Sequence, residues 1–507
     1  MLLAVLIPLL SMLCNITADG FNEIIHSNQF VSAVINSLTS TLVATVITMF
    51  FAFFAAWCTE RISIKIKAVF AVIFVLPMLV PSISHAFGLI ALFGANGMIT
   101  QFLGLNGSIY GFWGIVIGSL MYSFPVAYLM FASILHYEDA LPYRAALVLG
   151  INKWHSFLGI TLPYLRKSIV MIFFAIFTMI ITDYGVPLTV GGKVITLSVL
   201  MYNKAVGMID YSSGSVIGAV LLLPAILAFL ADMFSKENGQ NAFVTETIIP
   251  DTHGWINWLA HIYCVGVVIC VLAPIVSFLL MVFATKYPIN MDFTLYHLEM
   301  AVSRGALSYL VNSLIYALLA ASAGTIGAFG CAYMTTRMQG HFGKCLHLMI
   351  LTSMAIPGIV LGLSYVICFS GSWLYGTVFI IVFVNMVHFF ASPYLMMYNT
   401  MQKLNPNLEA VGLTLGIGKL RIIKDVIVPK VSGTMFEMFL YFFVNSMMTI
   451  SAVSFLAPPS PKPVALLINQ FEAQMLMESA AFVSLLILSM NLVIKVVVSY
   501  FKERVMV

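Results

Sequence analysis

Residues 138–168 read EDALPYRAALVLGINKWHSFLGITLPYLRKS, and residues 405–433 read NPNLEAVGLTLGIGKLRIIKDVIVPKVSG. Both stretches place small residues before a glycine, continue as an amphipathic run and end near a proline. Gly150 and Pro163 are thirteen residues apart, and so are Gly416 and Pro429. Glycine adopts backbone angles that redirect a chain, and proline is tolerated near the start of a helix. Each stretch therefore predicts a short helix, a glycine turn and a second helix that leads into a longer one.

The sequence around these stretches is that of a membrane protein. Of its 507 residues, 61% are hydrophobic and 8% are charged, whereas soluble domains average about 25% charged residues. Apolar runs of eighteen or more residues recur along the chain, and each is long enough to cross a bilayer as a helix. Since lipid offers no partners to backbone polar groups, these runs predict helices rather than open strands. The fold class is therefore all-α, and the lipid bilayer surrounds the protein.

Hydropathy predicts about twelve transmembrane helices. Their ranges are 1–18, 31–58, 67–94, 111–135, 166–188, 213–234, 258–285, 309–335, 345–370, 374–400, 433–457 and 479–501. With the N-terminus inside, the cytoplasmic segments hold 17 of the 23 basic residues, and the opposite side holds five. Because cytoplasmic loops carry an excess of Lys and Arg, we expect both termini in the cytoplasm.

The two halves of the sequence repeat each other. Matching positions are Asn36-Ser37-Leu38 with Asn312-Ser313-Leu314, Arg61 with Arg337, Pro81 with Pro357, Pro125 with Pro393, and Pro163 with Pro429. We predict a first half at 1–234 with a loop at about 136–165, a linker at 235–257, and a second half at 258–507 with a loop at about 401–432. Six helices in each half make the repeat parallel, about an axis along the membrane normal.

The repeat also bears on the N-terminus. Pro8 aligns with Pro274, but fewer apolar residues precede Pro8 than precede Pro274. We therefore expect that this chain lacks the front of its first helix.

The paired loops resemble those of ABC importer permeases. The signature of that family runs Glu-Ala-Ala, three residues, Gly, nine residues, Ile, one residue and Leu-Pro. The matching residues in the first half are Ala145, Ala146, Gly150, Ile160, Leu162 and Pro163; in the second half they are Gly416, Val426, Val428 and Pro429, with Ala410, Val411 and Gly412 in place of the opening triplet.

The signature glutamate is missing at its strict position, where Arg144 and Ala410 stand. Glu409 lies one residue early in the second half. The resemblance implies that each loop is a coupling helix that docks on an ATPase subunit, two copies of which would bind ATP and Mg²⁺. The chain itself has no GxxxxGK[ST] phosphate loop, no catalytic cluster and no metal-ligand spacing, so it is expected not to be an enzyme and to bind no cofactor.

The resemblance further implies an extracytoplasmic solute-binding protein and a place in the bacterial cytoplasmic (inner) membrane, and it gives no role to nucleic acid. In having two six-helix halves in one chain, this sequence resembles the branch of ABC importer permeases that serves ferric iron, thiamine, polyamines and phosphonates. Within this branch, segments 182–232 and 447–466 resemble 2-aminoethylphosphonate-type permeases. The resemblance thus implies phosphonate as the solute, with ferric iron, thiamine or a polyamine as the alternative.

Two groups of residues are candidates for the substrate path. Gly191, Gly192 and Lys193 could offer amides and a positive charge to an anion, or could form an ordinary glycine turn with a solvated lysine. Asp183 lies inside an apolar span, where a charge is costly and often functional. It could contact an ammonium group or brace neighbouring helices. Asn445 and Thr449 occupy the matching part of the second half.

Two other classes of protein compete with this interpretation. An ion-gradient-driven secondary transporter would need ionisable residues within the membrane, and the spans are nearly free of them. A membrane scaffold or membrane enzyme would leave the repeated loops unexplained.

Overall fold

The computed structural model describes residues 2–104, 107–234, 246, 248, 250, 254–337, 341–354, 356–456 and 462–506. Most of the predicted linker at 235–257 lies outside these residues, as does part of the segment 447–466. The described chain is helical almost throughout and carries one antiparallel hairpin, in which Ala284 pairs with Phe293 and Lys286 with Asn290. The predicted class, an all-helical membrane protein with several spans, is confirmed.

The number of spans differs from the predicted twelve. Among the described residues, eight helices are long and apolar enough to cross a membrane, or eleven if three bent helix pairs each count as one span. Two further apolar stretches, Lys67–Leu79 and Tyr211–Leu227, are not in that count, and the helix that holds the second continues to Phe234. They lie in the predicted third and sixth spans.

The repeated prolines explain part of this difference. Pro81 and Pro357 have extended backbones and each directly precedes a new helix. Proline lacks an N–H group and disfavours a helical residue before it, so a helix breaks there. The predicted spans 67–94 and 345–370 are thus each interrupted, and the two arms of the second differ in direction by 106°.

The chain forms two compact units that differ from the two sequence halves. Unit 1 contains Met1–Ile24, Met201–Leu222 and Tyr296–Val507, and unit 2 contains Ile25–Leu200 and Leu223–Leu295. The first helix of each sequence half packs within the unit that holds most of the other half. In unit 1 the Tyr365 hydroxyl of α18 donates to the carbonyl oxygen of Ala4, which precedes α1, at 2.7 Å. In unit 2 a Cβ atom at Gly88 of α5 would lie 2.4 Å from Pro274 of α14.

The elements of unit 2 in chain order are α3 (Asn28–Arg61), α4 (Lys67–Val75), the 3₁₀ turn η2 (Leu76–Leu79), α5 (Ser82–Phe93), α6 (Met98–Leu103), α7 (Phe112–His136), α8 (Leu141–Val148), α9 (Lys153–Ser156), the π-helical turn η3 (Phe157–Thr161), α10 (Leu162–Ile181), α11 (Gly185–Val190), α14 (Gly254–Phe283), β1 (Ala284–Lys286) and β2 (Asn290–Phe293). Two helices, α12 (Leu197–Tyr202) and α13 (Tyr211–Phe234), cross between the units.

The elements of unit 1 are η1 (Leu2–Leu6), α1 (Ile7–Cys14), α2 (Ala18–Ile25), η4 (Asn203–Gly207), α15 (Tyr296–Ser303), α16 (Ala306–Arg337), α17 (His341–Ser353), α18 (Gly358–Phe369), α19 (Val378–His388), α20 (Ala391–Gln402), α21 (Leu408–Thr414), α22 (Lys419–Ile422), the π-helical turn η5 (Ile423–Ile427), α23 (Val428–Met448), η6 (Val453–Phe455), α24 (Ala465–Ala473) and α25 (Met477–Met506).

The long helices α3 and α16 organise the two units. The buried face of α3 is rich in alanine, including Ala44, Ala52 and Ala55, and it packs against Phe124 and Phe131 of α7 in one hydrophobic core. Small residues let helix backbones approach closely in a membrane, where van der Waals packing drives association. In unit 1, α16 packs in the same way along α23, with further alanines buried on its face.

The repeated Asn-Ser-Leu motifs serve this packing. The Ser37 hydroxyl accepts a hydrogen bond from the backbone N–H of Leu197, the first residue of α12, at 2.7 Å. The Ser313 hydroxyl accepts one from the N–H of Val464, directly before α24, also at 2.7 Å. Both long helices thus cap a short helix whose first N–H groups would otherwise lack partners.

Candidate functional site

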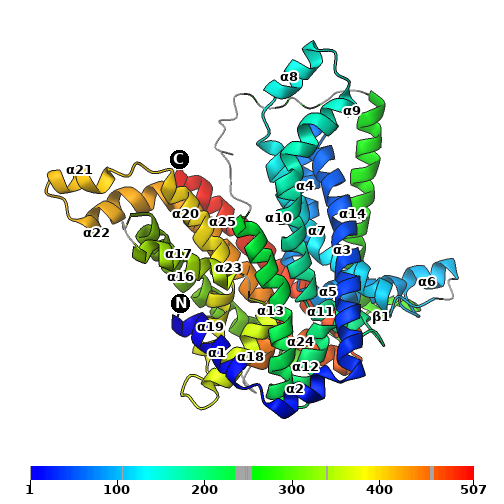
Figure 1. Cartoon of the computed structure of the whole chain (residues 1–507). Helices are drawn as coiled ribbons and strands as arrows, with labels where there is room; N and C mark the ends of the chain where they lie inside the picture. Colours follow the sequence, from blue (N-terminus) through cyan, green and yellow to red (C-terminus); the bar gives the residue numbers. More distant parts are fainter. Residues whose placement is uncertain are drawn as a thin grey trace. The chain divides into compact units, whose positions relative to one another are not determined.

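The two sequence-predicted stretches form projecting helical loops. We call residues 138–168 loop 1 and residues 405–433 loop 2. In unit 2, α8 and α9 of loop 1 extend beyond the ends of α3, α7 and α10, and in unit 1, α21 and α22 of loop 2 extend beyond α20 and α23 (Figure 1). Each loop consists of a short helix, a turn, a second short helix and a π-helical turn that runs into a spanning helix. This is the order of elements that the sequence predicts.

The glycine of each loop has a left-handed backbone. Gly150 and Gly416 both have φ of 71°. In loop 1 the N–H of Ile151 donates to the carbonyl of Ala146 at 2.9 Å, and in loop 2 the N–H of Ile417 donates to that of Gly412 at 2.8 Å. This pattern ends a helix by satisfying its last carbonyls, and it needs a left-handed residue, which glycine adopts without a Cβ penalty. The two turns therefore have the same geometry for the same reason.

The repeated prolines act on the second part of each loop. Pro163 is the second residue of α10 and Pro429 the second residue of α23. Each follows a π-helical turn, which contains Ile160 in loop 1 and Val426 in loop 2. Because proline has no N–H group to give to the preceding turn, a local widening of the helix accommodates it. The fixed spacing from glycine to proline thus sets the length of the second helix.

A buried contact inside each loop accounts for the small residues before the glycine. Ala146 of α8 is buried, and its counterpart in α21 is Gly412. A Cβ atom at Gly412 would lie 2.1 Å from Cδ1 of Ile422 in α22. The residue equivalent to Ile422 in loop 1 is the smaller Ser156, which is also buried. The loop with the smaller residue in its first helix, Gly412, thus has the larger residue, Ile422, in its second helix.

The tips of both loops expose apolar side chains. In loop 1, Leu147 is 77% exposed and Val148 is 87% exposed, and in loop 2, Leu415 is 69% exposed and Leu420 is 83% exposed. Ala145 and Ala410, which the family signature places on the same helices, are also exposed. Contiguous apolar side chains on a projecting loop are typical of an interaction surface.

The two positions of the missing glutamate differ between the loops. Arg144 forms an ion pair with Glu246, at 2.6 Å from Nη2 to Oε1, and the backbone oxygen of Glu246 accepts from the N–H of Ala140. Ala410 bears no charge. The neighbouring Glu409 is largely buried and faces Arg337, the last residue of α16, with Nε 3.3 Å from Oε1. The sequence marked Arg61 and Arg337 as landmarks of the repeat, but it did not place them beside the loops.

Asp183 caps a helix. Its Oδ2 accepts a hydrogen bond from the N–H of Val186 at 3.0 Å, at the start of α11, and its carboxylate also interacts with Ser82. The Ser198 hydroxyl donates to the backbone oxygen of Asp183 at 2.8 Å. Contacts of this kind are those by which Asp183 would brace neighbouring helices.

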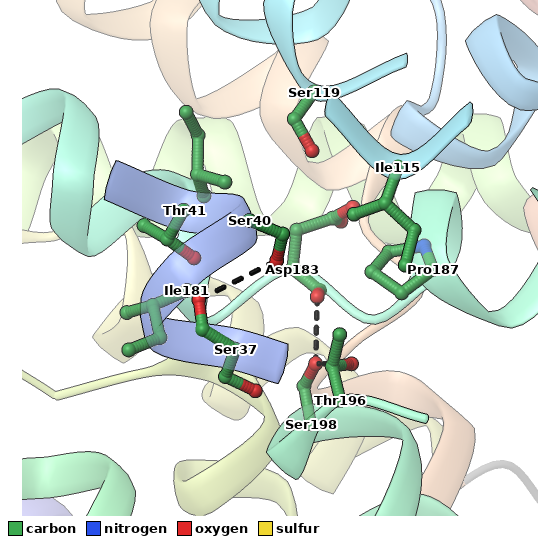
Figure 2. Close-up of a pocket in the computed structure, with 11 residues that line it drawn as sticks. Ser37, Ser40, Thr41, Ile115, Ser119, Ile181, Asp183, Pro187, Thr196 and Ser198 are labelled. Carbon is green, nitrogen blue, oxygen red and sulfur yellow. Dashed lines mark hydrogen bonds between the residues drawn. The ribbon is translucent and has the colours of Figure 1, made fainter. Parts of the chain in front are cut away.

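A small cavity in unit 2 lies beside Asp183 (Figure 2). Hydroxyl groups from α3, α7 and the segment before α12 line it, and they include Ser37, Ser40, Ser119 and Thr196. The Ser119 hydroxyl is buried and has no hydrogen-bond partner. The space is about 10 Å³, which is close to the minimum for one water molecule.

The other predicted substrate-path residues have structural partners of their own. A Cβ atom at Gly191 would lie 2.3 Å from the oxygen of Pro187, and Gly192 has φ of 55°, so both glycines are required by a tight turn. Lys193 beside them is exposed. Asn445 donates to the Tyr441 oxygen of its own helix, and its backbone oxygen accepts from the N–H of Thr449. Within unit 2, Gly191, Gly192 and Lys193 are not among the residues that line the cavity beside Asp183.

The described chain is thus a helical membrane protein with two equivalent projecting loops, each joined to a spanning helix. The chain belongs to the family of binding-protein-dependent transport system inner membrane components, which matches residues 48–236 and 324–507. Each matched region contains one loop. The chain is accordingly the non-catalytic, multi-pass permease component of a bacterial ABC importer, and ATPase partners rather than this chain bind ATP.

Several curated proteins are similar to this chain. The ferric transport system permease protein FbpB of Actinobacillus pleuropneumoniae is 25% identical over 492 residues, which cover 93% of this chain and 71% of that protein. A putative ferric transport system permease protein, FbpB 1 of Haemophilus influenzae, is 25% identical over 86% of this chain and 71% of its own length. The thiamine transport system permease protein ThiP of Haemophilus influenzae is 27% identical over 34% of each chain.

Among solved structures, a bacterial alginate ABC transporter in complex with an alginate pentasaccharide-bound periplasmic protein is similar over 48% of this chain and 88% of that chain, with a TM-score of 0.35 and 17% identity. The relatives named above are permeases for iron and thiamine. The prediction of a phosphonate solute is therefore not supported, whereas its ferric and thiamine alternative is.

Proposed function

We propose that loops 1 and 2 are the sites at which two ATPase subunits dock, and that the importer carries ferric iron. The observation that carries the docking proposal is the recurrence of one backbone design in two unlike sequences. Both loops have a left-handed glycine, a π-helical turn before proline and exposed apolar side chains at the tip. Docking on both loops would let the closure of the ATPase pair drive alternating access.

The chemistry of the tips supports a protein partner. Leu147, Val148 and Leu149 follow one another at the end of α8, and all are at least 75% exposed. Burying such side chains in a groove yields about 25 cal/mol per Å² of apolar surface. Lys153 follows the tip of loop 1 in the sequence, and Lys419, Arg421 and Lys424 follow that of loop 2. These basic residues could pair with carboxylates at the rim of the groove.

Docking on these loops requires them to face the cytoplasm, where ATP is available. The bias of Lys and Arg over the twelve predicted spans supports this orientation, with both termini in the cytoplasm. A cysteine introduced at exposed Leu147 should be labelled by a membrane-impermeant maleimide in inverted vesicles and not in intact cells. Labelling in intact cells would show that loop 1 faces outward, and it would contradict the docking proposal.

The solute proposal rests on the relatives. The ferric permeases match this chain over 86% and 93% of its length, whereas the thiamine permease matches 34% of it. An extracytoplasmic binding protein, as the family description implies, would deliver the iron. The permease would then open a path for iron that has already been selected outside the membrane.

Docking is tested by co-purification of a tagged chain from its native host. We expect an ATPase subunit at two copies per chain, and we expect the copurified complex to hydrolyse ATP. A chain carrying Leu147→Asp and Leu415→Asp should lose the ATPase while it retains its thermal unfolding temperature. Full recovery of the ATPase with this variant would contradict the docking proposal.

The solute is tested by uptake in host cells that lack the gene for this chain, with and without its return on a plasmid. We expect restored uptake of ⁵⁵Fe³⁺, no change in uptake of labelled thiamine or 2-aminoethylphosphonate, and loss of iron uptake when the partner ATPase carries a Walker A Lys→Ala change. Restored uptake of thiamine or the phosphonate alone would refute iron. Uptake that persists with the inactive ATPase would favour an ion-gradient-driven transporter.

A further inference from the structure

A buried ion pair joins loop 1 to the end of α3. Arg61 is the last residue of α3, and its guanidinium pairs with the carboxylate of Glu138 at the start of loop 1, 77 residues later. The Arg61 side chain is 8% exposed and that of Glu138 is 3% exposed. The guanidinium also lies 5.9 Å from the ring centre of Trp57 and 5.6 Å from that of Tyr143. These distances are those of cation–π contacts, so Arg61 is held on several sides.

The same network continues into the loop itself. The Tyr143 hydroxyl of α8 donates to Glu138 and lies 2.6 Å from Oγ1 of Thr161, in the π-helical turn η3. Burial raises the pKa of the Glu138 carboxyl, while the Tyr143 hydroxyl and the Arg61 guanidinium oppose that rise. One chain of contacts thus connects the end of α3 with the first helix of the loop and with the turn before α10.

Loop 2 has a corresponding ion pair whose glutamate stands at a different position. Arg337 ends α16 and lies 276 residues after Arg61, at the offset of the repeat. Its partner Glu409 is in α21, at the position that Tyr143 occupies in loop 1 when Gly150 and Gly416 are matched. The Arg337 and Glu409 side chains are 10% and 14% exposed. The carboxylate therefore comes from the docking helix in loop 2 and from the residues just before it in loop 1.

Stability alone does not account for this repetition. Removing two charges from water costs free energy that their attraction often fails to recover, and an apolar pair of similar volume is frequently at least as stable. What a buried pair does supply is a defined geometry, because separating the charges without water is costly. The two ion pairs lie at equivalent points of the repeat, although their glutamates occupy different positions. This indicates that both halves require a connection between the long helix and its loop.

We propose that Arg61–Glu138 and Arg337–Glu409 are positioning clamps that fix each docking loop to the end of its long membrane helix. The inference rests on the proposed docking function of the loops. The clamps transmit a displacement of the loop to α3 and α16, which pack along α7 and α23. Without the clamp, the loop still binds the ATPase. Part of the loop's displacement then bends the connection between loop and helix and does not move α3 or α16. Arg61 and Arg337 act through the loops and touch neither ATP nor solute.

The experiment compares the purified complex of permease, ATPase and binding protein in proteoliposomes, with Arg61→Met and Arg337→Met introduced singly and together. We expect the ATPase to co-purify at wild-type stoichiometry and to hydrolyse ATP. The amount of solute transported per ATP should fall roughly ten-fold in the double variant, which is the size of a typical coupling effect. Lys67→Met is the matched control, because Lys67 pairs with Glu60 beside Arg61 at 3.0 Å without touching the loop.

A purely structural role would lower the yield of complex and reduce transport and hydrolysis together, leaving their ratio unchanged. Glu138→Gln provides a second route if an arginine variant fails to assemble, because the amide keeps the size of the side chain and removes the charge with which Arg61 pairs. Amide hydrogen exchange should also quicken in residues 141–151 of Arg61→Met and not in those of Lys67→Met. A wild-type transport ratio in the double arginine variant, or in Glu138→Gln, would overturn the clamp. Failure of the unmodified chain to bind an ATPase would instead refute the docking function.

Discussion

The left-handed turn of loop 1 gives a sharp test of whether the proposed docking surface must be preformed. Gly150 has φ of 71°, and a Cβ atom placed on it would meet no other atom within 4 Å. The cost of Gly150→Ala therefore comes from the backbone alone, about 1–2 kcal/mol for an L-residue in the left-handed region. Since about 1.4 kcal/mol is a factor of ten in affinity, binding at loop 1 should weaken roughly 5- to 30-fold.

The matched control lies nine residues further along the same loop. Gly159 is inside the π-helical turn η3, and a Cβ atom there also meets nothing within 4 Å. Its φ is not left-handed, so Gly159→Ala should leave binding unchanged or improve it slightly, because alanine favours helices. Gly150→Asn should fall between wild type and Gly150→Ala, since asparagine tolerates left-handed angles better than alanine.

The assay is a fluorescence titration of ATPase subunits against the permease in nanodiscs, with each loop tested by its own variant. Gly416→Ala should reproduce the effect in loop 2, where φ is also 71° and the space is equally open. Equal affinities for Gly150→Ala and Gly159→Ala would show that the turn is not required for docking. A larger loss with asparagine than with alanine would rule out the backbone as the cause.

Further expectations concern the internal packing and are checked by thermal unfolding in detergent. Gly412→Ala should destabilise the protein by about 1–3 kcal/mol through overpacking, because its Cβ would lie 2.1 Å from Ile422; adding Ile422→Ser should recover most of the loss, and no recovery would refute that contact. Ser313→Ala leaves the N–H of Val464 unpaired and should cost about 1–3 kcal/mol; an unchanged unfolding temperature would contradict the capping role. Gly185→Ala places a Cβ 2.6 Å from the Ser82 hydroxyl and should be partly rescued by Ser82→Gly, whereas additive losses would show independent sites.

The last pair illustrates how the repeat conserves a contact while exchanging its residues. In unit 2, Gly185 lies against Ser82, and in unit 1, Gly358 lies against Ser451, with the small residue and the serine on opposite segments. Gly358 is the counterpart of Ser82 in the repeat, because the two are separated by the same number of residues as Arg61 and Arg337. Ser451 is likewise the counterpart of Gly185, with the separation of Gly150 and Gly416. When the halves are aligned, glycine stands opposite serine at both positions, so the residue types differ. What the two halves share is the close approach of the two segments.

The sequence by itself determined the properties that depend on neighbouring residues. Composition settled the membrane environment, and the recurrence of Gly150 with Gly416 and of Pro163 with Pro429 predicted two helix–turn–helix loops. These features are local, because glycine and proline act on their own backbone and on the adjacent turn. The prolines Pro81 and Pro357 carried the same kind of information, but hydropathy averaged over a window did not register the breaks that they cause.

The tertiary structure alone decided which distant residues meet. Arg61 and Glu138 are separated by 77 residues, and nothing local in either segment identifies its partner. From the sequence, Asp183 was a substrate candidate because an isolated carboxylate in an apolar run is costly. Besides the local N–H of Val186, packing supplies the Ser82 hydroxyl from a distant part of the chain as a partner for that carboxylate. The compact units likewise cut across the sequence halves, because packing depends on which helix faces fit together. The loops could be found in the sequence because backbone rules formed them, whereas their attachment to α3 and α16 arises from contacts that exist only in the folded chain.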